Sequence, residues 1–102
     1  MITAQQAEAL QQSLQSRLIS EKTAKARANR FILENLRDGF CAGRPRIVVF
    51  AEEAVWTVPV QFAFPDRIFG EVGEIVIQAI HGSILGFTPP TEIYRNAKQL
   101  LP

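Results

Sequence analysis

Hydrophobic and polar positions alternate most regularly from Ala54 to Phe64. The positions of one parity are all apolar, whereas those of the other parity include Thr57, Pro59 and Gln61. Because successive side chains of a strand point to opposite faces, this segment predicts a strand with one wholly apolar face. The apolar positions are Trp56, Val58, Val60, Phe62 and Phe64. We expect this face to be the inner surface of an antiparallel sheet that helices cover.

Two neighbouring strands are predicted from the same kind of pattern. The β-branched run Ile47 to Phe50 precedes the central strand, and Ile75 and Ile77 share one face of a later strand. A register that keeps Glu74 out of the core places these two isoleucines on the side of Trp56. The pairing of the later strand with the central one is therefore expected to be fixed by burial.

The dipeptide His81-Gly82 lies between two apolar segments and predicts a hairpin turn with glycine at a positive φ. Ile84 to Phe87 then forms a short fourth strand. Pro59 cannot donate to a strand ladder, so it predicts an edge position or a bulge in the central strand. The sheet is expected to span residues 46–87.

Apolar positions spaced by three or four residues predict helices on both sides of the sheet. The helical segments are an arm over 1–20, a core helix over 21–38 that Gly39 ends as a C-cap, and a C-terminal helix over 89–101 that begins with prolines. The arm and the core helix either form one continuous helix or break near Ser20. The inner side of the last helix is expected to carry Ile93, Ala97, Leu100 and Leu101.

These elements predict one α+β domain over residues 1–102. N-terminal helices pack on one face of a curved four-stranded antiparallel sheet, and a short C-terminal helix follows. The length of 102 residues, with 47% hydrophobic and 21% charged residues, suits a single folded core. No apolar run approaches the roughly 18 residues that span a bilayer, and the N-terminus lacks the pattern of a secretory signal. We therefore expect a cytoplasmic protein that does not enter a membrane.

The net charge of +1 is unevenly distributed. Between Arg17 and Arg46 there are eight basic and three acidic residues, whereas the rest of the chain after Arg46 has three basic and six acidic residues. A basic helical half suggests either a solvated face or a surface that contacts nucleic acid. The possible nucleic-acid contacts are Lys22, Lys25, Arg27, Arg30, Arg37, Arg44 and Arg46.

Two segments resemble those of PepSY-like domains. They are Trp56-Thr57-Val58-Pro59-Val60 and the stretch from Gly70 to Leu85, which follow a helix as in that family. The sequence departs from the family's last hairpin at Gln78, His81 and Ser83. Similar signatures also occur in uncharacterised small bacterial proteins. The resemblance implies a helix packed on an antiparallel sheet and a non-catalytic binding role.

The sequence offers little catalytic chemistry. Cys41 and His81 are the single cysteine and histidine, so the usual four-ligand zinc patterns are excluded, and nothing in the sequence places the two residues together. The carboxylates fall at expected turns and strand ends, and no phosphate-binding or dinucleotide motif is present. We expect no enzymatic activity, no metal and no cofactor.

The predicted first helix has a narrow apolar stripe that a single sheet with one covering helix leaves without a partner surface. The stripe consists of Ala7, Leu10, Leu14 and Leu18. We expect it to contact a second copy in a symmetric homodimer, or another protein. The sequence therefore predicts a small non-enzymatic protein-interaction module, with nucleic-acid association through the basic segment as the alternative.

Overall fold

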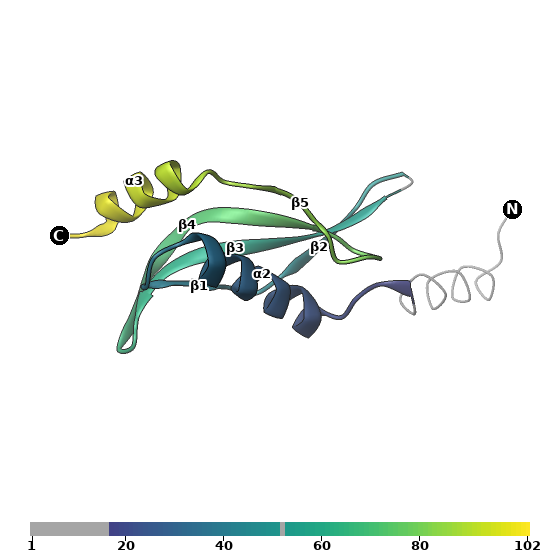
Figure 1. Cartoon of the computed structure of the whole chain (residues 1–102), viewed down its shortest axis with the longest axis horizontal. Coiled ribbons are helices and arrows are strands. Elements are labelled where there is room, and N and C mark those ends of the chain that lie inside the picture. Colours follow the sequence, from purple (N-terminus) through teal and green to yellow (C-terminus); the bar gives the residue numbers. More distant parts are fainter. Residues whose placement is uncertain (1–16, 52) are drawn as a thin grey trace, which may run out of the picture.

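The computed structural model describes residues 17–51 and 53–102 and confirms the α+β class (Figure 1). An antiparallel sheet curls beneath one helix, and a second helix follows at the C-terminus. The elements in chain order are α2 (Glu21–Asn35), β1 (Phe40–Ala42), β2 (Arg46–Val49), β3 (Ala54–Phe64), β4 (Arg67–Gln78), β5 (Ile84–Phe87) and α3 (Pro90–Leu100). The predicted arm lies outside the described residues except for 17–20.

The sheet has five strands, one more than expected. β1 and β2 both pair with the same side of β3, β4 pairs with the other side, and β5 pairs with β4. The extra strand is β1, in the segment between the predicted core helix and the predicted sheet. Only three residues long, it pairs Phe40 with Phe62 and Ala42 with Val60. A strand this short has too few positions to show an alternating pattern.

The register between β3 and β4 buries the apolar side chains and keeps Glu74 out of the core. Trp56 is opposite Ile77 and Val58 is opposite Ile75, as predicted, and Glu74 is exposed. Register shifts after Val60 and after Phe62 add bulges toward the far end of the hairpin. Bulges increase the local twist of a strand pair, which is consistent with the curl of the sheet.

Pro59 lies in a central strand rather than at an edge, and the irregularity that it predicts is found in the neighbouring strands. The carbonyl of Pro59 accepts a hydrogen bond from Gly43 N at 2.8 Å, so Pro59 faces the gap between β1 and β2. The strand pairing on this side of β3 is interrupted at Pro59, because proline has no N–H to donate. Pro59 thus explains why this side of the sheet is made of two short strands.

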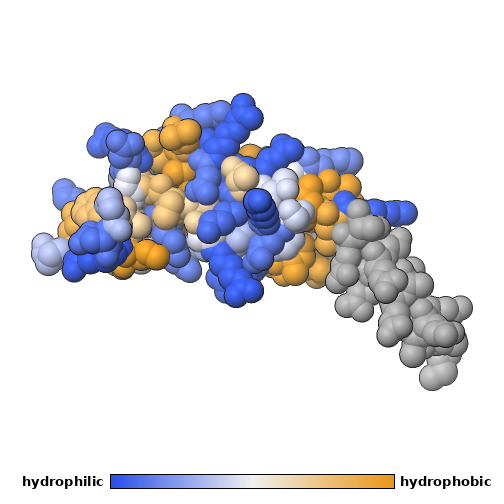
Figure 2. Space-filling view, turned by 90° about the horizontal axis from the view of Figure 1, so that it is seen from below, coloured by the Kyte–Doolittle hydropathy of each residue, from blue (hydrophilic) through white to orange (hydrophobic). Residues whose placement is uncertain are grey.

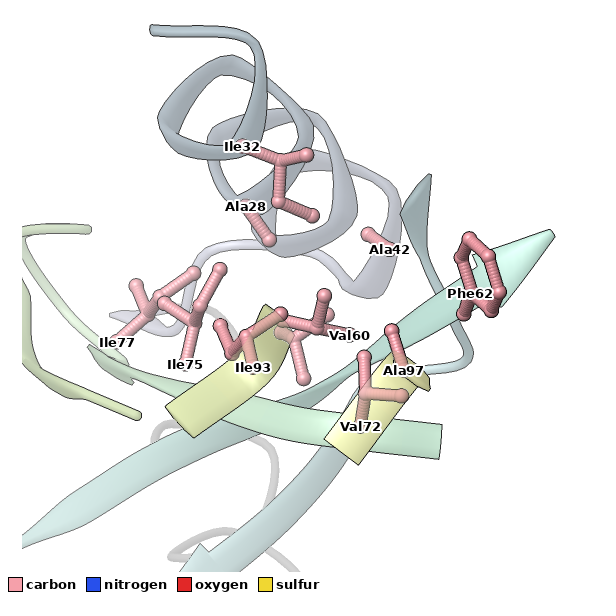
Figure 3. Close-up of a cluster of buried hydrophobic side chains, with 11 residues drawn as sticks. Ala28, Ile32, Ala42, Val60, Phe62, Val72, Ile75, Ile77, Ile93 and Ala97 are labelled. Atoms are coloured by element: carbon pink, nitrogen blue, oxygen red, sulfur yellow. The ribbon is translucent and has the colours of Figure 1, made fainter. Parts of the chain in front are cut away.

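Ser20 is the N-cap of helix α2, and its hydroxyl accepts a hydrogen bond from Thr23 N at 3.0 Å. The helix ends at Asn35, earlier than the expected residue 38. Gly39 is not its C-cap but lies in the following turn with a φ of 100°. Figure 3 shows Ala28 and Ile32 of α2 directed toward the apolar face of the sheet. The small side chain of Ala28 is fully buried, which allows close approach of helix and sheet.

Helix α3 begins at Pro90, and its buried residues are Ile93 and Ala97. Both join the core that α2 covers, beside Val60 and Val72 (Figure 3). Leu100 and Leu101, which were expected on the inner side, are exposed instead. Leu101 follows the last residue of the helix, so the expectation was wrong for it, whereas the Leu100 side chain still lies against Gly70 of β4 although the residue is 39% exposed.

The central tryptophan is only half-buried. Its indole N–H donates to Ile19 O at 3.1 Å, and Ile19 N donates to Ala79 O at 2.7 Å. These bonds fix the segment before α2 across the end of β3 and β4. Trp56 therefore holds an incoming chain segment as well as packing against the core.

Candidate interaction site

The predicted stripe of the first helix lies almost wholly outside the described residues. This applies to Ala7, Leu10 and Leu14. Leu18 is described and is half-buried.

None of the described helices is long and apolar enough to cross a membrane.

The basic residues of α2 gather around two hollows, one lined by Lys22, Arg27 and Arg30 and the other by Lys22, Lys25 and Arg44, but several of the predicted contacts are engaged by neighbours. Arg30 pairs with Glu34 at 3.1 Å and Arg44 pairs with Glu21 at 3.2 Å. The guanidinium of Arg37 lies over the ring of Tyr94, 5.0 Å from its centroid. The two glutamates partly offset the positive field that would attract phosphates, whereas the ring of Tyr94 carries no charge.

Arg46 lies on the opposite face of the sheet from α2. It lines a groove of about 330 Å³ together with Glu71, Glu74 and Glu92. Three glutamates line the same groove as Arg46, and their negative charges disfavour a polyanion at this position. The remaining basic residues are on exposed positions of α2, namely Lys22, Lys25 and Arg27.

Cys41 and His81 are not brought together. Cys41 is in β1 opposite Gln61, with its Sγ 3.9 Å from Gln61 Oε1. His81 lies in the turn after β4, which ends opposite Val55 near the other end of β3. Within 17–51 and 53–102, no group of three or more His, Cys, Asp or Glu side chains is arranged to hold a metal ion.

Side chains from α2, from α3 and from the segment that leads into α3 protect two parts of the sheet's edges. Asn29 of α2 accepts a hydrogen bond from Ala42 N at 2.8 Å, on the outer side of β1. Along β4, beyond the end of β5, Thr88 Oγ1 accepts from Glu74 N at 3.0 Å and Asn96 Nδ2 donates to Val72 O at 2.9 Å. These bonds satisfy backbone groups that would otherwise be open to another strand.

Strand β2 has no such protection among the residues that the structure describes. Its only partner there is β3, and all four of its residues are exposed. Three of these residues are apolar, and the exposed Phe50 follows them. We call Ile47, Val48, Val49 and Phe50 the β2 apolar run. In the view of Figure 2, hydrophobic surface lies toward both ends of the molecule, with hydrophilic surface between.

The outward backbone groups of β2 can be assigned from the turn that follows it. Phe50 N donates to Glu53 O at 2.7 Å, so Phe50 faces β3. Backbone direction alternates along a strand, so Val48 faces β3 too. Ile47 and Val49 therefore point their N–H and C=O groups away from the sheet.

The other outer strand, β5, is less suited to pairing. A register shift between Val76 and Ile77 interrupts its ladder with β4, whereas β2 pairs with β3 over four consecutive positions without a shift. The ring of Phe87 is packed against Phe31 of α2, with centroids 4.7 Å apart. Bulges and short, irregular edges disfavour the addition of a further strand.

The sequence pattern predicted β2 as a strand but not its exposure. Four successive apolar residues place apolar side chains on both faces, which is typical of a strand covered on both sides. The sequence did contain one indication of this exposure: the chain predicts too few helices to cover both faces of a strand as apolar as this one.

Comparisons of the chain with family models, curated proteins and solved structures found no significant match.

Proposed function

We propose that this protein is a small non-enzymatic protein-interaction module. The observation that carries the proposal is the β2 apolar run on an unprotected strand edge. Exposed apolar side chains in a continuous group, next to unpaired backbone groups, are typical of surfaces that bind another polypeptide. A binding role is also what the resemblance to PepSY-like domains implies.

A protein partner fits this surface better than nucleic acid does. Nucleic acid would contact the basic residues that gather along α2, but Arg30 and Arg44 are paired there with glutamates, and Arg46 lines a groove with carboxylates on the other face. If the alternative held, binding to DNA or RNA would weaken steeply with salt.

The apolar stripe predicted for the first helix remains a second candidate contact. Ala7, Leu10, Leu14 and Leu18 would form an apolar interface of their own with a second copy or another protein. We also propose a cytoplasmic location, which the unpaired thiol of Cys41 supports.

The proposal is tested by placing a photo-crosslinking amino acid at Val49 of the full chain in cells of its source organism. We expect discrete protein adducts at this position. The matched control is Leu33 on α2, which is 81% exposed but lies on a helix without open backbone groups. If position 49 gave no more adduct than position 33, the β2 apolar run would not be a binding surface.

A further inference from the structure

We infer that the partner of the β2 edge is a second copy of this chain, joined by antiparallel pairing of β2 with β2 across a two-fold axis. The inference rests on the proposed function and names its partner. The two five-stranded sheets would become one continuous sheet through this pair. The same surface of each copy forms both sides of the contact, as two-fold symmetry requires.

One register satisfies the open backbone groups of both copies. The outward groups belong to Ile47 and Val49, so a hydrogen-bonded pair must join Ile47 of one copy to Val49 of the other. This places Val48 opposite Val48 on the two-fold axis, as a pair without backbone hydrogen bonds. The two outer pairs supply about four hydrogen bonds in total.

Side chains are complementary in this register. On the α2 side, Ile47 packs against Val49 of the second copy, and on the opposite side the two Val48 side chains meet. Arg46 lies opposite Phe50 of the second copy, where a guanidinium can stack on a ring. No like charges oppose each other within the paired stretch.

Charges at the two ends of β2 favour the antiparallel arrangement. Arg46 stands at its start, and Glu53 follows its end. Antiparallel pairing brings the basic start of one strand beside the acidic turn of the other, whereas parallel pairing would place arginine next to arginine.

The proposed pairing between the two β2 strands ends at a specific feature of the chain on each side. Pro45 has no N–H, and at the other end the chain turns back between Phe50 and Glu53. Helix α2 packs over β1, β3 and β4, so among the residues that the structure describes no helix lies along the outer side of β2. A second β2 therefore fits this edge over its whole length.

The register is tested by disulfide cross-linking in the Cys41→Ser background, which removes the single native thiol. The Val48→Cys variant should form an intermolecular disulfide, because directly opposite residues without backbone hydrogen bonds have Cα atoms about 4.5 Å apart. The Val49→Cys variant is the control, because two copies of residue 49 are diagonal neighbours about 7–8 Å apart.

Accessibility alone predicts the reverse order, since Val49 is 69% exposed and Val48 only 36%. Faster or more complete cross-linking at position 48 supports the register. Equal or faster cross-linking at position 49 would overturn it.

The association itself is measured as the molar mass of the purified full chain by sedimentation equilibrium. We expect twice the mass of one chain, and a shift to the single mass for Val49→Lys. Leu85→Lys, which places the same charge on an exposed position of β5, should remain dimeric. Circular dichroism verifies that each variant is folded.

Other outcomes assign the partner differently. A dimer that only Leu10→Glu with Leu14→Glu dissociates would overturn the β2 pairing in favour of the first helix. A monomeric wild type whose position 49 cross-links to a different protein in cells would overturn the inference but keep the proposed function. A monomer without adducts at position 49 would overturn both.

Discussion

The closest packing of helix against sheet depends on Gly73. A Cβ atom at this position would lie 2.9 Å from Ile93 Cγ1 and 3.0 Å from Thr88 Cβ. Neither neighbour can move easily, because Ile93 is buried in the core and Thr88 holds Glu74 through its hydroxyl. The absence of a side chain at residue 73 therefore sets how closely α3 approaches β4.

Gly73→Ala is predicted to lower the free energy of unfolding by about 1–3 kcal/mol, the usual cost of an overpacked contact. The matched control is Gly86→Ala, since a Cβ at residue 86 has no neighbour within 4 Å. Urea unfolding at one fixed protein concentration measures both variants. Equal stability of the two would show that α3 does not pack as described.

At the scale of elements, the outer side of β1 is held by α2 through one side chain. Asn29 Oδ1 accepts the hydrogen bond from Ala42 N, and Ala42 is buried. A buried N–H without a partner costs about 1–3 kcal/mol, part of which the better helix propensity of alanine offsets.

Asn29→Ala is therefore predicted to destabilise the fold by about 1 kcal/mol, whereas Asn29→Asp, which keeps an acceptor oxygen, should cost less. Amide hydrogen exchange provides a local readout, because the Ala42 amide should lose protection in the alanine variant only. Unchanged protection of Ala42 in Asn29→Ala would contradict the described bond.

Strong local patterns predicted most of these elements. The alternation around Trp56, the position of Glu74 and the prolines before α3 were sufficient for β3, the β3–β4 register and the last helix. The missed features depend on tertiary position. β1 forms because Phe40 and Ala42 find partners in β3, and Leu101 is exposed because it follows the end of the helix.

The candidate site was less predictable than the fold. A run of apolar residues has the same local pattern whether the strand is central or at an edge, so exposure of Val48 and Val49 required the strand order. The pair of Arg30 with Glu34 follows from their spacing of four residues in one helix. The pair of Arg44 with Glu21 and the groove that Arg46 shares with carboxylates join segments far apart in the sequence, so the sequence pattern could not predict them.

At the scale of the whole molecule, the two outer sides of the sheet differ in their protection. Asn29, Thr88 and Asn96 satisfy outward backbone groups of β1 and β4, whereas β2 presents Ile47 and Val49 without a described partner. The fold thus leaves one regular apolar strand available, and the proposed function depends on this strand.

Concentration-dependent hydrogen exchange, resolved by residue, tests this claim most directly. Amides of Arg46 and Val48 face β3 and should be protected at every concentration, whereas the Phe87 amide faces outward from β5 and should exchange at every concentration. The account predicts that the Ile47 and Val49 amides exchange quickly in dilute protein and become protected as the concentration rises. Rapid exchange of both amides at all concentrations, in a protein that stays monomeric, would contradict it.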